Sequence, residues 1–287
     1  SSVIVVYGKP TTAILTSGSD QDLCEGDDID LGFQTSGYNL VYSWLKDGAA
    51  INGITSDSTF FADSTMISST GLYQLALSGT CGTDTSSVIQ VEINKNTSYL
   101  SGLNDTAVCE GDQVLMPLFY DGHDVSVSIH KLGSLTPVLP DTIMLNGNIT
   151  ATFSLNNISY TDEGYYYAIF AGSCGTVYSD TVFVTVHTTT AITSTFTNPL
   201  NVICEDAGIS FAFAAEGHSL TYAWNYNGTG AGTDSTLTIT SADTSESGFY
   251  QLVTSGDCGT DSSQLVQLIV HPTTRVLSTI ADTAICE

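Results

Sequence analysis

The sequence predicts an all-β protein made of three tandem antiparallel β-sandwiches in an elongated array, with partial repeats at both ends. Its 287 residues are about three times the ~100 residues of one sandwich. Thr, Ser, Val, Ile, Tyr and Gly dominate, which is typical of strands and turns. No stretch carries apolar residues at a sustained helical period. A pattern of Cys, Gly and aromatic residues also recurs three times, which indicates a tandem repeat.

Each repeat has an early Cys followed by Glu, then a Gly-x-Tyr sequence, then a late Cys-Gly-Thr. The Tyr lies eight residues before the late Cys in all three copies. Successive early cysteines, counting Cys286, are 85, 95 and 82 residues apart, which fits one sandwich per repeat. The early cysteines are Cys24, Cys109 and Cys204, and the late ones are Cys81, Cys174 and Cys258.

The repeats set the expected domain boundaries. We expect sandwiches over 10–94, 95–189 and 190–272. Residues 1–9 are expected to be the last strand of an upstream repeat, because Ser1–Val6 matches Ser86–Val91. Residues 273–287 are expected to form the first strand of a downstream repeat, because Asp282–Glu287 matches Asp105–Glu110. The alternative is an end strand donated to a neighbouring subunit, as in donor-strand polymers.

Runs of alternating apolar and polar residues mark the strands and predict one buried face for each. Strand C carries Trp44 in the first repeat and Trp224 in the third. The middle repeat has Val127-Ser128-Ile129 at that place, so its core must be filled differently. The expected strands are 29–33 and 209–213 for B, 41–44 and 220–224 for C, 73–77 and 250–253 for F, and 182–186 and 265–270 for G.

The Glu-Gly before strand B, the Trp on strand C and the Gly-x-Tyr opening strand F resemble the I-set pattern of the immunoglobulin superfamily. In that pattern the Tyr is the tyrosine corner. The Cys-x-Gly-Asp at 24–27 and 109–112, with a second Cys in the last turn, resembles the Ig-like and PKD-like repeats of very large Bacteroidota surface proteins. Those proteins include gliding and adhesion filaments. The resemblance covers essentially the whole chain and implies immunoglobulin-like sandwiches in an exported, extracellular cell-surface protein.

The seven cysteines recur at fixed places, which predicts a disulfide framework rather than buried free thiols. In an immunoglobulin-like strand order, strands B and F run in the same direction. The early Cys then lies at the start of B and the late Cys at the finish of F, eight strand residues or roughly 26 Å away. A disulfide requires Cα atoms within about 7 Å.

This geometry favours pairs across the junctions between repeats. The favoured pairs are Cys24–Cys174 and Cys109–Cys258, which leave Cys81, Cys204 and Cys286 to pair outside this sequence or to stay single. Pairing within each repeat remains open, because the strand order is itself inferred. Those pairs would be Cys24–Cys81, Cys109–Cys174 and Cys204–Cys258.

The composition excludes several functions. A formal net charge of −25 with only five Lys and Arg repels nucleic acid and anionic membrane surfaces. No run of about 18 apolar residues predicts membrane insertion. No Gly-x-Ser-x-Gly, phosphate loop or His-Glu-x-x-His sequence occurs, so we expect no enzyme and no catalytic residues.

Metal and glycan sites are secondary expectations. His123 and His218 follow glycines in equivalent B–C turns and are interpreted as turn residues, with no metal site expected. Calcium is the weak alternative cofactor, at Glu25, Asp27, Glu110 and Asp112. Asp-Ser/Thr-hydrophobic triplets, which Bacteroidota O-glycosylate, make four threonines candidate glycan sites, with strand-edge chemistry as the equal alternative. These threonines are Thr106, Thr142, Thr181 and Thr283.

The sequence therefore favours a non-catalytic structural segment of a cell-surface filament or stalk, stiffened by disulfides. Its partners would be neighbouring repeats of the same long chain or filament. The alternative is an adhesin module that binds a surface glycan or protein through loops. Tyr165–Tyr167 and Phe60–Phe61 would be its candidate contacts, although packing in the core is the favoured role for these aromatic residues.

Overall fold

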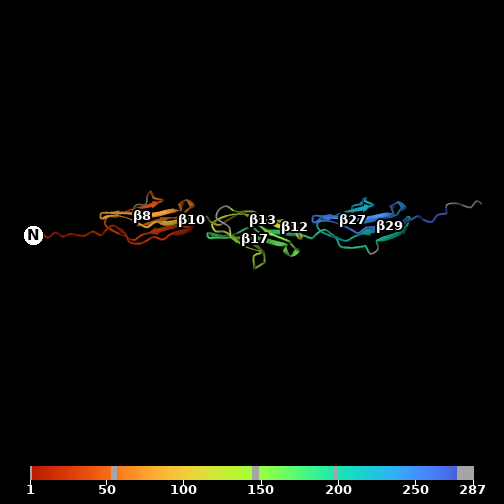
Figure 1. Cartoon of the computed structure of the whole chain (residues 1–287), viewed down its shortest axis with the longest axis horizontal. Helices are drawn as coiled ribbons and strands as arrows, with labels where there is room; N and C mark the ends of the chain where they lie inside the picture. Colours follow the sequence, from red (N-terminus) through yellow and green to blue (C-terminus); the bar gives the residue numbers. More distant parts are fainter. Residues whose placement is uncertain (1, 53–56, 144–148, 197–198, 277–287) are drawn as a thin grey trace, which may run out of the picture. The chain divides into compact units, whose positions relative to one another are not determined.

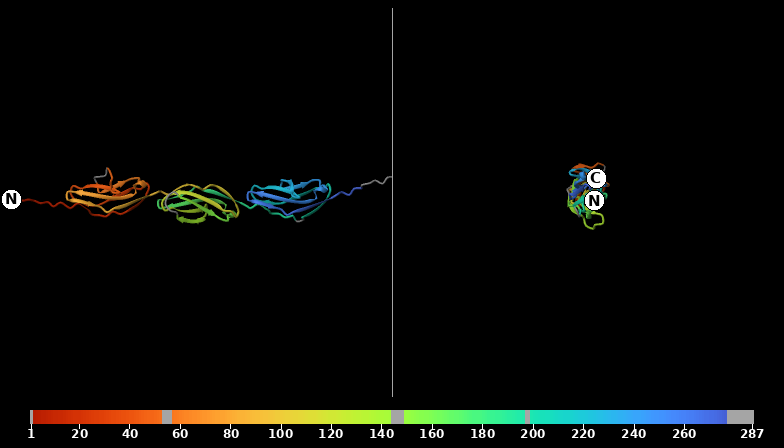
Figure 2. Two further views of the ribbon diagram at one scale, coloured as in Figure 1. Left: turned by 45° about the horizontal axis from the view of Figure 1, so that its top comes forward. Right: turned by 90° about the vertical axis from the view of Figure 1, so that its right-hand side faces the viewer.

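The computed structural model describes residues 2–52, 57–143, 149–196 and 199–276, of which the side chains of 139–143 and 149 are not described (Figure 1). These residues form β-strands and three short 3-10 helices, which confirms the all-β class. The strands build three tandem sandwiches of antiparallel sheets, drawn from two further directions in Figure 2.

The chain divides into two compact units. The first contains residues 1–104, 116–153 and 165–182, and the second contains 105–115, 154–164 and 183–287. The first sandwich lies in the first unit, the third sandwich lies in the second, and the middle sandwich contributes strands to both.

The first sandwich has a six-stranded sheet whose edge strand β2 pairs in parallel with β10, whereas the other pairs are antiparallel. Its order is β2 (Gln21–Cys24), β10 (Ile89–Asn94), β8 (Gly71–Gly79), β5 (Val41–Lys46) and β6 (Ala49–Ala50), with β9 (Gly82–Thr85) on β8. Two shorter pairs complete it. They are β3 (Ile29–Gly32) with β7 (Thr59–Ala62), and β1 (Ala13–Ile14) with β4 (Thr35–Ser36).

The third sandwich repeats this plan. Its large sheet has the order β21 (Leu200–Cys204), β29 (Val266–His271), β27 (Gly248–Gly256), β24 (Thr221–Tyr226) and β25 (Thr229–Gly232), with β28 (Gly259–Ser262) on β27. The short pairs are β22 (Ile209–Ala212) with β26 (Thr236–Ile239), and β20 (Ala191–Ile192) with β23 (Ala215–Glu216). The expected strands B, C and F of both repeats, and strand G of the third, are therefore confirmed.

The middle sandwich uses the same pairings within each unit. In the first unit, β11 (Ser98–Ser101) pairs with β13 (Val114–Asp121), and β14 (Ser126–Lys131) pairs with both β15 (Leu139–Ile143) and β17 (Gly164–Gly172). The hairpin partner of β17 is β18 (Gly175–Tyr178). In the second unit, β12 (Thr106–Cys109) pairs in parallel with β19 (Val182–His187). The remaining strand is β16 (Ile149–Leu155).

Aromatic residues fill the sandwich cores. Trp44 and Trp224 are fully buried, and each lies opposite a leucine of strand F. In the middle sandwich the equivalent pair is Ile129 and Ala168, which is much smaller. Aromatic residues take the space in this core, because Tyr120 and Phe170 are fully buried with ring centroids 5.2 Å apart.

Tyrosine corners are present in the first and third sandwiches as expected. Each 3-10 helix, η1 (Ile67–Ser69), η2 (Tyr160–Asp162) and η3 (Thr244–Glu246), precedes strand F. The Tyr73 hydroxyl donates to the Ser69 carbonyl oxygen at 2.8 Å, and Tyr250 donates to Glu246 at 2.9 Å. These bonds fix the start of the strand whose far end carries the late Cys.

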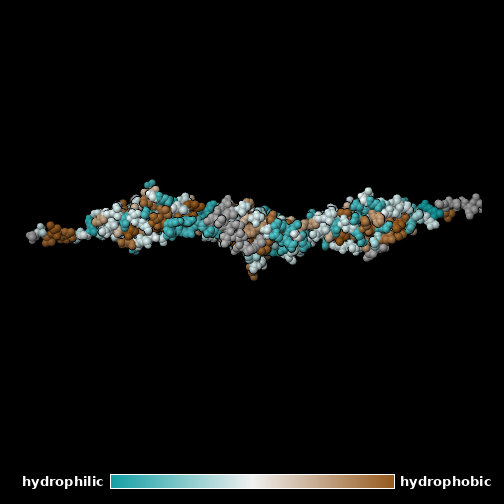
Figure 3. Space-filling view, viewed as in Figure 1, coloured by the Kyte–Doolittle hydropathy of each residue, from teal (hydrophilic) through white to brown (hydrophobic). Residues whose placement is uncertain are grey.

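Residues 2–9 form no strand within the described chain. Val3, Ile4 and Val6 are 86%, 84% and 85% exposed. The N-terminal segment is the brown, apolar stretch at the left end of Figure 3. Their role as the last strand of a preceding repeat stays a prediction. The matching segment at 277–287 lies outside the described residues.

Candidate functional site at the cysteine junctions

Two disulfides join early and late cysteines of different repeats. Cys24 is bonded to Cys174, and Cys109 is bonded to Cys258, each pair with a Cα–Cα distance of 5.5 Å. Each bond lies inside one compact unit. These are the pairs that strand geometry favoured in the sequence. The early Cys of one repeat is thus bonded to the late Cys of the next repeat, twice in succession.

The local fold explains where each cysteine lies. Cys24 ends β2 and pairs in register with Asn94, the last residue of β10. In the same way Cys109 ends β12 and pairs with His187, the last residue of β19. The early Cys therefore lies beside the point where the chain leaves its sandwich. The late Cys174 lies in the tight turn between β17 and β18.

At the first junction, the turn that carries Cys174 contacts the segment entering the middle sandwich. The Thr97 N–H donates to the Cys174 carbonyl oxygen at 3.1 Å. Asn96 donates from Nδ2 to the Glu25 carbonyl oxygen at 2.9 Å, and Lys95 forms an ion pair with Asp121. Backbone, disulfide and polar contacts together hold this junction.

At the second junction the contacts are made by histidines. The rings of His187 and His218 stack with centroids 3.8 Å apart and an interplanar angle of 14°. His218 Nδ1 lies 2.7 Å from Asp257 Oδ2, and the hydrogen bond from His218 lowers the pKa of Asp257, helped by hydrogen bonding to Ser219. The Thr190 N–H donates to the Cys258 carbonyl oxygen at 3.1 Å, as Thr97 does to Cys174.

Three side chains occupy equivalent places at each junction. We name these the junction positions: the last residue of strand G, the residue after the B–C turn glycine, and the residue before the late Cys. At the first junction they are Asn94, His123 and Ser173, and at the second they are His187, His218 and Asp257.

The same positions recur at the start of the first sandwich. There Lys9 stands at the strand G position, Tyr38 follows the turn glycine, and Thr80 precedes the late Cys. The Lys9 ammonium lies 4.1 Å from the centroid of the Tyr38 ring. At the first junction His123 Nδ1 lies 2.9 Å from Ser173 Oγ. Each junction therefore has its own polar contact on a shared backbone frame.

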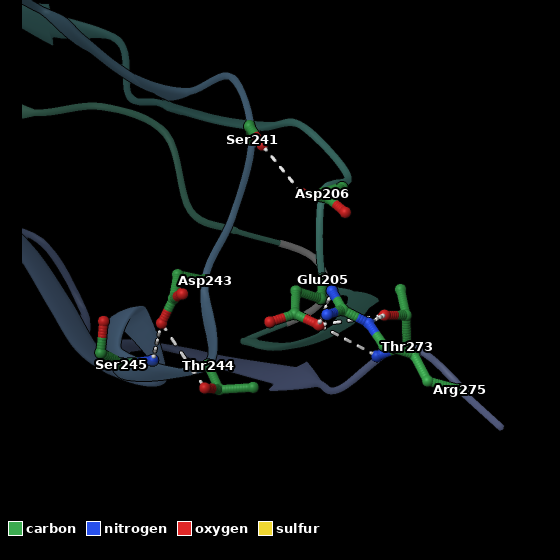
Figure 4. Close-up of polar contacts among 8 residues, drawn as sticks. All are labelled: Glu205, Asp206, Ser241, Asp243, Thr244, Ser245, Thr273 and Arg275. Atoms are coloured by element: carbon green, nitrogen blue, oxygen red, sulfur yellow. Dashed lines mark hydrogen bonds and ion pairs between the residues drawn. The ribbon is translucent and has the colours of Figure 1, made fainter. Parts of the chain in front are cut away.

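Cys81 and Cys204 are exposed free thiols. They occupy the late position of the first sandwich and the early position of the third. Figure 4 shows the surroundings of Glu205, the residue after Cys204. Thr273 donates to Glu205 Oε2 from its N–H at 3.2 Å and from its hydroxyl at 3.1 Å, and Arg275 Nη2 lies 3.6 Å from the same oxygen. The segment after β29 is thus tied beside the early Cys, as Asn96 is at the first junction.

The acidic residues considered for calcium have turn roles. Asp27 Oδ2 accepts the Cys24 N–H at 2.9 Å, and the Glu110 N–H donates to the His187 carbonyl oxygen at 2.9 Å. Over the described ranges, one group of three or more His, Cys, Asp or Glu residues has ligand atoms within 4.8 Å of one another, and it is His187, His218 and Asp257. Glu25, Asp27, Glu110 and Asp112 are outside that group.

The candidate glycan threonines lie in different settings. Thr106 is half-buried at the start of β12, and Thr181 is exposed before β19. The neighbouring Asp105 accepts the Phe183 N–H at 2.7 Å, which supports the strand-edge interpretation of this Asp-Thr sequence. Thr142 pairs with Val127 in the β14–β15 ladder, and Thr283 lies outside the described residues.

The aromatic residues considered for ligand contact alternate between core and surface. Tyr166 and Phe60 are buried at 1% and 5% exposure, whereas Tyr165 and Phe61 are 50% and 60% exposed. Tyr167 stacks on His130 with ring centroids 5.4 Å apart. Two of the five therefore face solvent.

No described helix has both the length and the apolar character needed to span a bilayer.

Comparisons with solved structures support the fold. The I-band fragment I67–I69 from titin aligns with 94% of this chain and 100% of its own, at a TM-score of 0.70 and 14% identity. Sidekick-1 immunoglobulin domains 1–5 align with 93% of this chain and 60% of their own, at a TM-score of 0.53 and 11% identity. No protein-family model and no curated protein matches the sequence. The fold is therefore a tandem array of three immunoglobulin-like domains.

Proposed function

We propose that this chain is a non-catalytic structural segment of an extracellular cell-surface filament or stalk, in which disulfides couple each immunoglobulin-like sandwich to the next. The observation that carries the proposal is the repeated bond from an early Cys to the late Cys of the following repeat. A pattern that recurs at successive junctions extends to any number of repeats. The Bacteroidota filament setting follows from the sequence resemblance described above.

The disulfides suit a molecule that carries load. The bonded residues are 150 and 149 positions apart in the sequence, so each bond closes a long loop. Tension along the chain passes from Cys24 directly to Cys174 and bypasses the residues between them. Most of the first and middle sandwiches is thereby shielded from extension.

Short crossings between repeats support the same role. Strand β10 ends at Asn94, and the contact of Thr97 with Cys174 already belongs to the next sandwich. This crossing contains no Gly/Ser run of the kind that makes linkers flexible. The disulfide adds a second covalent connection beside the backbone, so each junction is held twice.

Extracellular placement is consistent with this chemistry. Structural disulfides persist in oxidising compartments. A formal net charge of −25 keeps such a protein soluble and limits self-association of its exposed strands.

Single-molecule stretching tests the load-bearing role. In a Cys109→Ser/Cys258→Ser variant pulled from its termini, the remaining Cys24–Cys174 bond hides a loop of 150 residues, or about 500 Å of chain at full extension. We expect reduction to lengthen the fully extended chain by that amount. Reduction should lengthen the Cys24→Ser/Cys174→Ser variant by a similar amount. A variant that lacks all four cysteines should have the same extended length before and after reduction. Equal lengths before and after reduction of either single-bond variant would refute the shielding.

Adhesion is a second candidate, favoured by the exposed rings of Phe61 and Tyr165. A glycan array probed with the three-domain chain, alongside a Phe61→Ser/Tyr165→Ser variant, distinguishes the two roles. Saturable binding that the double substitution removes would favour an adhesin. Binding that is absent, or that the substitution leaves unchanged, would count against these residues as ligand contacts.

A further inference from the structure

We propose that the second junction is a binding site for a divalent transition-metal ion, with Zn²⁺ the best match, held by His187, His218 and Asp257. Each residue offers one ligand atom, and the three atoms lie within 4.8 Å of one another. Imidazole nitrogen and carboxylate oxygen are ligands that Zn²⁺ takes in proteins, and three protein ligands leave a fourth position for water. Hard cations such as Ca²⁺ and Mg²⁺ prefer oxygen ligands, so two histidines disfavour them.

Small side-chain rotations would complete the coordination geometry. At the usual Zn–N and Zn–O distances, tetrahedral ligand atoms lie about 3.4 Å from one another. The stacked rings of His187 and His218 keep their in-plane lone pairs nearly parallel, so one ring must turn for both to face an ion. Such a turn is easy because the second torsion of His is broad. It also has room, since the side chains of His218 and Asp257 are each 53% exposed.

The disulfide holds the backbones of two of the three residues. His187 pairs in register with Cys109, and Asp257 directly precedes Cys258. The Cys109–Cys258 bond sets the Cα atoms of these two cysteines 5.5 Å apart. His218 lies beside them, since its Nδ1 is 2.7 Å from Asp257 Oδ2. Ligands held in place before the ion arrives lose less entropy on binding.

The equivalent positions elsewhere in the chain provide an internal comparison. The first junction has the same backbone frame but carries Asn94, His123 and Ser173, which include a single imidazole and no carboxylate. Lys9, Tyr38 and Thr80 at the start of the first sandwich include neither. The ligand set is therefore particular to the second junction and is not imposed by the fold.

The surroundings favour a cation. The protein has a formal net charge of −25, which raises the local concentration of metal ions. A metal held here would cross-link the same segments as the disulfide and would survive reduction.

Titration with ZnCl₂ tests the site. The oxidised protein should carry Cys81→Ser, Cys204→Ser and Cys286→Ser, because free thiols also bind Zn²⁺. Calorimetry in excess Mg²⁺, which occupies isolated carboxylates, should show one equivalent of Zn²⁺. His187→Asn, His218→Tyr and Asp257→Ser, which import residues from equivalent positions, should each weaken binding at least about tenfold. His123→Tyr at the first junction is the matched control and should change nothing.

Imidazole NMR spectra provide a second readout that needs no variant. Zn²⁺ should shift the ring signals of His187 and His218 and leave those of His123, His130 and His271 in place. The proposal is overturned by the absence of stoichiometric binding in Mg²⁺, by binding that the three substitutions leave intact, or by equal shifts of all five histidines.

Discussion

The backbone N–H of Thr97 donates a 3.1 Å hydrogen bond to the carbonyl oxygen of Cys174, and Thr190 makes the same bond to Cys258. In both places the first residues of a sandwich are held against the turn that carries its late Cys. The early Cys of the preceding repeat lies beside the end of strand G, because Cys24 pairs with Asn94 and Cys109 pairs with His187. The backbone crossing and the disulfide therefore run side by side. This arrangement explains how one short turn sequence can serve both connections.

The overlapping disulfides predict that a cut in the middle sandwich will not separate the chain. Lys131 ends β14 and is followed by the exposed residues 132–138, so trypsin should cleave after it. In an Arg275→Gln chain, which lacks the exposed tryptic site after β29, the products 1–131 and 132–287 are joined by both Cys24–Cys174 and Cys109–Cys258. Gel electrophoresis should show one full-length band without reductant and two fragments with it. Removal of either cysteine pair alone should leave the fragments joined, and two bands without reductant would contradict the pairing.

Acid should weaken the first and third sandwiches more than the middle one. The N–H groups of Ile14 and Thr85 hydrogen-bond to Asp84 and lower its pKa, and Ile192 and Ser262 do the same for Asp261. Since these folded-state pKa values lie below those of the unfolded chain, the stabilisation is present above pH ~4 and is lost as pH falls through the folded values. The middle sandwich has Val177 at this place.

Amide substitutions test this difference. Asp84→Asn and Asp261→Asn should lower the melting temperature at pH 7 and reduce the further loss on acidification to pH 3. Calorimetric scans at both pH values measure each effect, with Val177→Asn as the matched control in the middle sandwich. A variant that melts as the parent chain does at pH 7 would show that these carboxylates contribute nothing measurable.

Much of the fold could be predicted because the three repeats can be aligned, which places each Cys at a definite end of a strand. Eight residues from Tyr to the late Cys place that Cys at the far end of strand F, whereas the early Cys lies at the near end of strand B. This distance alone disfavours pairing within a repeat. The absence of Trp in the middle repeat predicted a different core, but the sequence did not predict which residues fill it. Tyr120 and Phe170 fill that core from positions that alternation predicts only as buried.

The proposed metal site could not be predicted from the sequence. His218 was expected to be a turn residue, and it does lie between β23 and β24. His187 and Asp257 carry no motif, and the three residues are far apart in the sequence. One signal was present: all three occupy positions fixed by the repeat, at the end of strand G, after the turn glycine and before the late Cys. These positions predict a common site only if the end of strand G, the B–C turn and the late Cys turn are known to lie side by side. That arrangement depends on the disulfide pairing across repeats.

The tyrosine corner of the third sandwich predicts sensitivity to alkali. Burial, aided by Tyr226 and Glu246, raises the pKa of Tyr250 to about 12. A folded-state pKa above the unfolded value of ~10 means that the stability is fully present below pH 10 and is lost as pH rises toward 12. Tyr250→Phe should remove this alkaline loss and cost about 1 kcal/mol at pH 7, because the hydrogen bond to Glu246 disappears. Urea unfolding followed by Trp224 fluorescence, in a Trp44→Phe chain that leaves Trp224 as the single Trp, measures both effects. A Tyr250→Phe chain with an unchanged alkaline profile would contradict this role.

The free thiols Cys81 and Cys204 should pair with each other between copies of the chain. Cys204 occupies the place of Cys24 and Cys109, and Cys81 occupies the place of Cys174 and Cys258. Each exposed thiol is therefore one half of a junction that occurs twice within the chain. Two thiols and one oxidised glutathione give a disulfide and two molecules of reduced glutathione. In a Cys286→Ser chain oxidised at high protein concentration, peptide mapping of the dimer should find Cys81 joined to Cys204. Only this pairing continues the order of early Cys to late Cys. The contrary outcome is a random mixture that also contains Cys81–Cys81 and Cys204–Cys204 pairs. It would show that the junction surfaces do not select their partner.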